Sequence, residues 1–218
     1  MSIVTPDGGL TALGYGLCVL AAILLFLAAS FISKKGSGKK SSTKQLVYCS
    51  AAMALAFIAS YLKIWPMPFG GSVTLFSMLF ICLIGYWYGL KAGLLTGLAY
   101  GILQFLQNPY VLSLFQVCCD YILAFAALGL SGLFSKSKNG LVKGFIVGIL
   151  ARGFFHSLGG YLYWMDYIPD NFPKALTSLY PIIYNYSYIL VEGALTVVVM
   201  LLPPVSKALA QVKRSATD

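Results

Sequence analysis

Long, continuous apolar segments divide this chain, and none of them alternates between apolar and polar residues as a half-buried strand would. A helix needs about 20 mostly apolar residues to cross the hydrocarbon core of a bilayer. Strands of a membrane β-barrel would be about 10 residues long, with alternating hydrophobicity. The pattern therefore predicts an all-α integral membrane protein with seven spans, at 9–33, 45–64, 72–89, 91–107, 110–134, 142–164 and 177–202.

Composition supports lipid as the solvent for most of the chain. Hydrophobic residues make up 59% of the sequence and charged residues only 10%, whereas soluble domains carry roughly 25% charged residues. The segment 9–33 is interpreted as a helix and not as a signal peptide. It lacks a basic region before it, and its apolar run exceeds the about 7–15 residues usual in a signal peptide.

The basic residues predict the orientation, because Lys and Arg collect in cytoplasmic loops. Twelve of the 15 basic residues fall on one side of a seven-span arrangement, in the 33–45 loop, at Lys91, between 136 and 143, and in the tail. The N-terminus is then outside and the C-terminus cytoplasmic. The expected organisation is an extra N-terminal helix at 1–33, a basic cytoplasmic linker at 34–44, a six-helix bundle at 45–202 and a cytoplasmic tail at 203–218.

Small residues recur at helical spacing on two of the predicted helices. Gly93, Gly97 and Gly101 line one face of 91–107, which favours close packing of helices inside the bundle. Ala52, Ala56 and Ser60 form a similar stripe on 45–64. That stripe has two interpretations, which are internal packing and docking of a partner subunit.

Four ionisable residues lie inside predicted spans, where such groups are costly and are candidates for function. Asp120 would either form an ion pair with Arg152 that holds helices together or neutralise a cationic ligand. Glu192 lies deeper and is expected to be structural, with Arg152 as a candidate partner. On 142–164, Arg152 begins a ladder at intervals of four residues that continues through His156, Gly160 and Trp164.

Aromatic and polar residues are concentrated in the outer halves of the last three predicted helices. The segment that begins at Tyr180 holds four tyrosines and Asn185 within nine residues. One acid among many aromatic faces suits a small organic cation, which predicts a binding site and not a catalytic one. The sequence has no phosphate-binding GxxxxGK[ST] loop for ATP hydrolysis, and its five cysteines lack metal-binding spacing. No cofactor or metal is expected in this chain.

The residues also resemble those of a known family. The resemblance is carried by Pro68-Phe69-Gly70-Gly71-Ser72, Tyr88-Gly89-Leu90-Lys91-Ala92-Gly93-Leu94, the segment Gln116 to Phe125 with Asp120, Ala151-Arg152-Gly153-Phe154-Phe155-His156, Gly160, Trp164, and the pair Tyr180 and Asn185. Over 45–202 the chain is similar to the thiamine-specific substrate-binding component (S-component) of energy-coupling factor vitamin transporters.

The resemblance implies a six-helix bundle that holds one thiamine near the outer face of a bacterial plasma membrane. It implies polar contacts from Asp120, His156, Tyr180 and Asn185, with Trp164 as the stacking indole. The further contacts that it implies are Tyr100, Tyr110, Tyr121 and, for close approach to the backbone, Gly160. The implied partners are a membrane coupling subunit, facing Ala52, Ala56 and Ser60, and two cytoplasmic ATPases.

This sequence departs from the family pattern in two places, because the helix at 9–33 is additional and Asp120 stands where some members have Glu. In the family a tryptophan of the first outer loop lids the pocket, and here either Trp65 or Phe69 could do so. Three alternatives stay open. The chain is an S-component for another vitamin or a thiamine precursor, an intramembrane enzyme that uses Asp120, Arg152 and His156, or a scaffold without a ligand.

Overall fold

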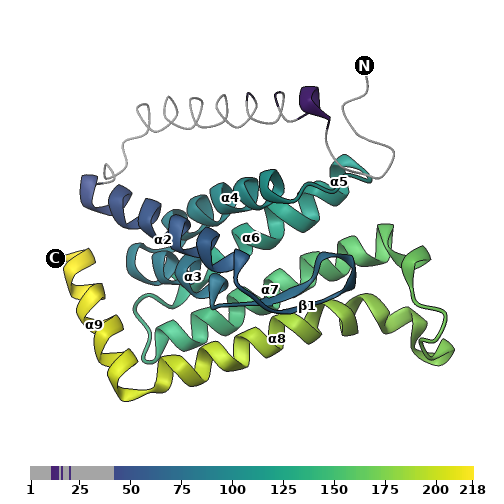
Figure 1. Ribbon diagram of the computed structural model, residues 1–218. Helices are drawn as coiled ribbons and strands as arrows, with labels where there is room; N and C mark the ends of the chain where they lie inside the picture. Colours follow the sequence, from purple (N-terminus) through teal and green to yellow (C-terminus); the bar gives the residue numbers. More distant parts are fainter. Residues whose placement is uncertain (1–10, 15, 17–19, 21–41) are drawn as a thin grey trace.

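The protein is a helical bundle in the computed structural model of Figure 1, which describes residues 11–14, 16, 20 and 42–218. Most of the predicted helix 9–33 and most of the linker 34–44 lie outside the described residues. Three helical stretches are long and apolar enough to cross a membrane, at Leu114–Phe134, Gly140–Tyr163 and Lys174–Leu201. The prediction of an all-α membrane protein is therefore confirmed at the level of fold class.

The first three helices of the bundle correspond to three predicted spans, and the bounds of the first and third helix match the prediction to within a few residues. Helix α2 (Thr43–Tyr61) begins after Ser42, whose side-chain oxygen accepts a hydrogen bond from the Gln45 N–H and so caps the helix. Helices α3 (Ser77–Tyr88) and α4 (Leu90–Gln107) are separated by Gly89 alone. Its φ of +88° is readily adopted by glycine and strained for other residues. This conformation lets the chain reverse direction within one residue.

A short hairpin precedes α3 where the sequence predicted helix. Strands β1 (Lys63–Pro66) and β2 (Ser72–Thr74) pair antiparallel, and the 3₁₀ turn η1 (Pro68–Gly70) connects them. The predicted span 72–89 is therefore wrong at its start, since helix begins only at Ser77. The apolar run continues through the strand, and periodicity alone does not separate a short buried strand from the first turn of a helix.

The second half of the bundle contains one irregular helix and two long regular ones. The irregular helix joins α5 (Leu114–Val117), the π-helix η2 (Cys118–Leu123), α6 (Ala124–Ala126) and the 3₁₀ stretch η3 (Ala127–Phe134). Helix α7 (Gly140–Tyr163) and helix α8 (Tyr180–Leu201) pack against each other, with the short turns η4 (Met165–Tyr167) and η5 (Lys174–Leu179) between them.

Glycines allow α4 to pack directly on the backbone of the irregular helix. A side chain at Gly93 would meet the Gly129 backbone, one at Gly97 would meet the backbone of Phe125, and one at Gly101 that of Tyr121. Because there is no room for a Cβ at these positions, the two backbones lie in contact. The prediction of close internal packing by this glycine ladder is confirmed.

The small-residue stripe of α2 faces the inside of the bundle. Ala52, Ala56 and Ser60 are 6%, 0% and 5% exposed. Ala56 belongs to the main core, and its carbonyl accepts a hydrogen bond from the Tyr100 hydroxyl. The stripe therefore packs inside the bundle in this structure, and its role as a docking face for a partner subunit stays a prediction. The exposed face of α2 carries Leu46, Val47, Leu55, Ile58 and Tyr61.

The predicted tail 203–218 forms a further helix, α9 (Pro203–Thr217). It turns away from the end of α8 and packs near the start of α2 and the end of α3 (Figure 1). The Tyr88 hydroxyl donates to the Ala216 carbonyl at 2.8 Å, and the Lys213 Nζ lies 3.8 Å from the centre of the Tyr86 ring. The basic residues of the tail therefore belong to an ordered helix.

Candidate ligand-binding site

A cavity of about 420 Å³ lies among the hairpin, α4, the irregular helix, α7 and α8. Its volume falls within the range of about 300–1,000 Å³ typical of small-molecule sites. All nine residues predicted to contact a ligand line it, which are Tyr100, Tyr110, Asp120, Tyr121, His156, Gly160, Trp164, Tyr180 and Asn185. Residues from helices far apart in the sequence therefore converge on one site.

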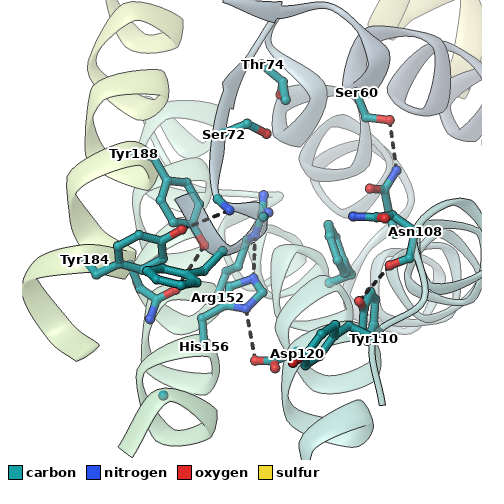
Figure 2. Close-up of a pocket in the computed structure, with 18 of the residues that line it drawn as sticks. Ser60, Ser72, Thr74, Asn108, Tyr110, Asp120, Arg152, His156, Tyr184 and Tyr188 are labelled. Carbon is teal, nitrogen blue, oxygen red and sulfur yellow. Dashed lines mark hydrogen bonds and ion pairs between the residues drawn. The ribbon is translucent and has the colours of Figure 1, made fainter. Parts of the chain in front are cut away.

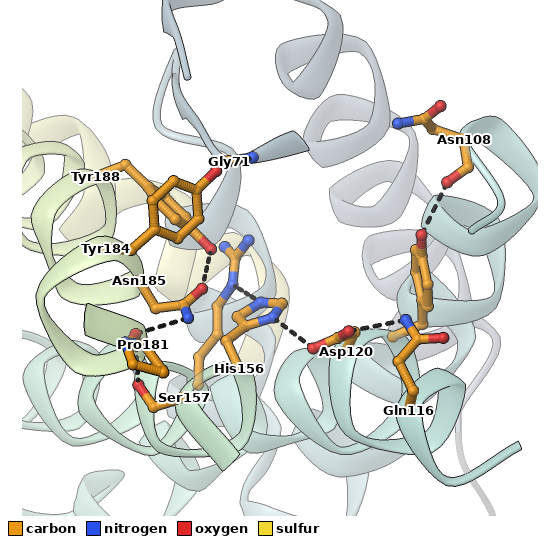
Figure 3. Close-up of polar contacts among 12 residues, drawn as sticks. Gly71, Asn108, Gln116, Asp120, His156, Ser157, Pro181, Tyr184, Asn185 and Tyr188 are labelled. Atoms are coloured by element: carbon orange, nitrogen blue, oxygen red, sulfur yellow. Dashed lines mark hydrogen bonds and ion pairs between the residues drawn. The ribbon is translucent and has the colours of Figure 1, made fainter. Parts of the chain in front are cut away.

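Asp120 stands in a chain of hydrogen bonds that crosses from the irregular helix to α7 (Figure 3). Its Oδ2 accepts from Gln116 Nε2 at 2.8 Å, and its Oδ1 lies 3.4 Å from His156 Nδ1. Arg152 Nε donates to His156 Nε2 at 3.3 Å. Because Nε2 accepts this bond, the arrangement assigns the imidazole proton to Nδ1, which donates to Asp120. His156 is then a neutral positioning group for the carboxylate.

Arg152 forms no ion pair with Asp120 or with Glu192. Within the described part of the chain, the one contact of an acid with a basic side chain at ion-pair distance is that of Asp120 with His156, whose imidazole is neutral in this arrangement. The Arg152 guanidinium instead lies over the Phe125 ring, 4.6 Å from its centre, as favoured by cation–π attraction. Both earlier pairings, Arg152 with Asp120 and Arg152 with Glu192, are therefore wrong.

Glu192 is a structural residue that binds the start of α3. Its side chain is buried, and its Oε2 accepts from both the backbone N–H and the hydroxyl of Thr74, each at 2.7 Å. Its Oε1 lies 3.4 Å from the Met78 N–H and from the Ser77 hydroxyl. A carboxylate at the N-terminus of a helix is stabilised by the free N–H groups there. Glu192 thus joins α8 to the hairpin, as its structural assignment predicted.

Aromatic rings form one wall of the cavity around Trp164. The indole lies against Tyr110, with ring centres 4.9 Å apart and an angle of 30° between planes. Phe69 reaches this wall from the hairpin, and its ring centre lies 6.3 Å from that of Trp164 and 6.2 Å from that of Tyr167. Trp65 is 68% exposed and does not line the cavity. Of the two candidate lid residues, Phe69 is the one that covers the site.

Tyr184 holds the tip of the hairpin over the cavity. Its hydroxyl donates to the Pro68 carbonyl and accepts from the Gly71 N–H at 3.1 Å. A Cβ at Gly71 would lie 2.7 Å from that hydroxyl, so a larger residue would displace the hairpin from α8. Tyr180, in turn, stacks on Tyr184 with ring centres 5.9 Å apart.

Asn185 is fixed by neighbours on its own helix. Its Nδ2 donates to the Pro181 carbonyl at 2.8 Å, and its Oδ1 accepts from the Tyr188 hydroxyl at 3.0 Å. Gly160 of α7 lies against Pro181, because a Cβ there would approach the proline Cβ to 2.8 Å. Gly160 thus brings α8 close to α7 as well as lining the cavity, a packing role that the sequence did not predict.

Two of the predicted pocket tyrosines use their hydroxyls elsewhere. The Tyr100 hydroxyl donates to the Ala56 carbonyl at 3.1 Å, and that of Tyr121 donates to the Asn108 carbonyl at 2.8 Å. Both residues therefore offer ring surface to the cavity. Figure 2 shows Asn108 and Ser60 on one side of the open space, with Tyr184 and Tyr188 on the other.

Several lining residues were not predicted to belong to the site. They include Gly71 of the hairpin, Tyr184 and Tyr188 of α8, and Ser60, Gln104 and Gln107 at the junction of α2 and α4. A signal was available for the glutamines, because two amides three residues apart near the outer end of a membrane helix require polar partners. Gly71 gave no such signal, since its place at the cavity depends on how the hairpin folds back onto α8.

Comparison with known proteins places this geometry in a family. A family model described as thiamine transporter protein matches residues 46–211. The thiamine transporter ThiT of Bacillus subtilis (strain 168) is 32% identical over 177 residues, which cover 72% of this chain and 87% of that protein. The ThiT of Lacticaseibacillus paracasei (strain ATCC 334) is 28% identical over 176 residues, covering 72% of this chain and 86% of that protein.

A solved structure agrees with these matches. ThiT from Listeria monocytogenes superimposes with a TM-score of 0.58 at 26% identity, covering 73% of this chain and 94% of that chain. The matched region contains the hairpin, the irregular helix, α7 and α8, and hence the whole cavity. This chain therefore belongs to the thiamine transporter protein family.

Proposed function

We propose that this chain binds thiamine from outside the cell as the S-component of an energy-coupling factor importer. The observation that carries the proposal is the environment of Asp120, an acid in an aromatic cavity whose neighbours are an amide and a neutral imidazole. A carboxylate without a permanent cationic partner favours a ligand that brings a positive charge. The thiazolium ring of thiamine is such a cation, and it is flat enough to stack on an indole.

Each lining residue has a role in this proposal. Asp120 neutralises the ligand charge and His156 holds the carboxylate in place. Trp164 and Tyr110 provide ring faces for stacking, where a cation gains about 0.5–2 kcal/mol. Tyr180 and Asn185 orient the polar edge of the ligand, and Gly160 leaves room beside them. Tyr100 and Tyr121 close the floor with their rings.

The protein is a multi-pass membrane protein of the bacterial plasma membrane, and it belongs to a transporter family and not to a family of enzymes. The proposed topology has seven spans, with the N-terminus outside and the C-terminus in the cytoplasm. It divides into the helix within 1–33, the linker 34–44, the six-helix unit 45–202 and the tail 203–218. The distribution of Lys and Arg supports it, as does the position of the cavity at the end of the bundle away from α9.

The proposed partners supply the energy for uptake. They are a membrane coupling subunit and two cytoplasmic ATPases, and ATP would be bound and hydrolysed by those ATPases. Because Ala52, Ala56 and Ser60 are buried, a coupling subunit would meet α2 through its exposed face, at Leu55 and Ile58. A thiamine precursor is the nearest other ligand, because it shares part of the same chemistry.

Thiamine titration of the purified chain in detergent tests the proposal through quenching of tryptophan fluorescence. Trp164 lies in the cavity, so saturable quenching is expected at micromolar concentration or below. The Asp170→Asn variant is a matched control, because Asp170 is an exposed carboxylate of an outer loop and does not line the cavity. A flat titration with the folded protein would contradict the proposal.

A further inference from the structure

Three polar side chains form a cluster in the same cavity, at the junction of α2 and α4. They are Ser60, Gln104 and Gln107, and all three line the cavity. The two glutamines are half-buried, and Ser60 is 5% exposed. None of the three takes part in the hydrogen bonds that fix Asp120 or Asn185.

The hydrogen bonds inside this cluster leave specific groups unused. Gln104 Nε2 donates to Ser60 Oγ at 3.0 Å and to Gln107 Oε1 at 3.1 Å, which uses both of its hydrogens. The Ser60 hydroxyl donates to the Phe57 carbonyl at 2.6 Å and also lies 3.2 Å from Gln107 Oε1. The acceptor Gln104 Oε1 and the two hydrogens of Gln107 Nε2 therefore have no partner among the residues that the structure describes.

These unused groups have a defined chemistry. One amide presents an acceptor and its neighbour three residues along α4 presents a donor, and both belong to side chains that line the cavity. Polar groups removed from water cost free energy unless they are paired. A neutral ligand group that both donates and accepts satisfies the two amides, whereas an apolar group leaves both unpaired.

We infer that Gln104 and Gln107 form a second polar subsite, which binds a neutral donor–acceptor group of the ligand and sets selectivity among vitamin forms. This inference rests on the proposed function, since it concerns the same cavity. Thiamine carries two groups of this chemistry, the primary hydroxyl on its thiazolium side chain and the aminopyrimidine edge. Both are separate from the ring nitrogen whose charge Asp120 neutralises, so one ligand can use both subsites.

Variants of the glutamines, combined with ligand analogues, test the subsite. Gln107→Leu removes the free donor with little change in volume, and Gln107→Glu removes it while keeping an oxygen that can accept from Gln104. Gln107→Leu is expected to weaken thiamine binding about tenfold, as loss of one hydrogen bond to the ligand does. Gln107→Glu is expected to lose less, because its added negative charge attracts the cationic ligand and offsets part of the lost hydrogen bond. Gln211→Leu on α9 is the matched control, because that glutamine is exposed and remote from the cavity.

The analogues identify the group that the subsite binds. One replaces the hydroxyethyl chain of thiamine by ethyl, and oxythiamine replaces the amino group by an oxo group. The analogue that lacks the recognised group is expected to bind the wild-type chain and Gln107→Leu with equal affinity, because this analogue makes no hydrogen bond with Gln107 that the substitution could remove. Folding of every variant is checked by its thermal melting temperature and by gel filtration in detergent.

The outcomes separate this inference from the proposed function. Tight thiamine binding by the wild-type chain, with the affinity of Gln107→Leu unchanged within about twofold, overturns the subsite and leaves the proposed function intact. If Gln107→Leu loses the same affinity for thiamine and for both analogues, the subsite is also overturned, because the substitution then acts through general packing. Failure of the wild-type chain to bind thiamine overturns both.

Discussion

Asp120 Oδ1 lies 3.4 Å from His156 Nδ1, and the same carboxylate packs against Gly159, which follows His156 by three residues, about one turn along α7. The aspartate comes from the π-helical stretch of the irregular helix, and the other two residues come from α7. The π-helix is a form often found at functional sites. The position of the acid is thus fixed from two helices before any ligand arrives.

Loss of the His156 contact is expected to weaken thiamine binding. His156→Ala removes the donor that holds Asp120, and a hydrogen bond to a charged group is worth about 1.5–3 kcal/mol, or about 10- to 100-fold in the dissociation constant. His156→Asn, whose side-chain amide can donate from a similar position, is expected to recover part of the affinity. Equal affinities of the alanine and asparagine variants would contradict a role for the hydrogen bond that His156 donates to Asp120.

Gly159→Ala tests how closely the carboxylate must be placed. The new methyl group would lie 2.7 Å from Asp120 Oδ1, so the carboxylate must shift. Alanine also gains about 1 kcal/mol of helix propensity over glycine, which limits any loss of stability. We expect thiamine affinity to fall about tenfold while the melting temperature changes little. Unchanged affinity, measured by calorimetric titration, would contradict the fixed position of Asp120.

Glu192→Gln is expected to reduce stability more than ligand affinity. The carboxylate accepts hydrogen bonds from Thr74 and from the first turn of α3, and an amide supplies one acceptor fewer. The expected loss is about 1–3 kcal/mol, which lowers the melting temperature by several degrees. Thr74→Val removes one partner of the same carboxylate. The two changes should therefore be non-additive, and simple additivity would refute the contact.

The two lid candidates on the hairpin give a matched pair of variants. Phe69→Ala removes the ring that contacts Trp164, Tyr167 and Tyr184, so bound thiamine is expected to dissociate faster. Trp65→Ala changes an exposed residue outside the cavity and should leave the dissociation rate unaltered. Stopped-flow release of thiamine measures both rates. The assignment of the lid fails if Trp65→Ala has the larger effect.

The sequence predicts the helices well because apolar length is a direct requirement of the bilayer. The bounds of α2, α4 and α7 follow their apolar runs to within a few residues. Helix α9 was missed because its apolar positions, such as Val205 and Leu209, are separated by polar residues such as Lys207, and the segment is too polar for a membrane span. Its structure depends on contacts with Tyr86 and Tyr88 of α3.

The residue types of the site were predictable, and their pairings were not. Asp120 and His156 stood out as ionisable groups in apolar helices, Trp164 and Tyr180 stood out as aromatic residues near them, and family resemblance added Tyr100. Whether Arg152 would meet an acid or a ring depended on the rotation of α7 against its neighbours. The place of Phe69 depended in the same way on the hairpin. Such pairings follow from tertiary packing, which residue spacing does not determine.

The most direct test of a charge-selective site compares thiamine with an isostere whose thiazolium is replaced by a neutral thiophene ring. Calorimetric titration of the wild-type chain, Asp120→Asn and Asp170→Asn gives the affinity ratio of the two ligands for each protein. The wild-type chain and Asp170→Asn are expected to prefer the cation by about tenfold or more, and Asp120→Asn is expected to lose that preference. An unchanged ratio in Asp120→Asn would contradict the claim that Asp120 neutralises the bound ligand.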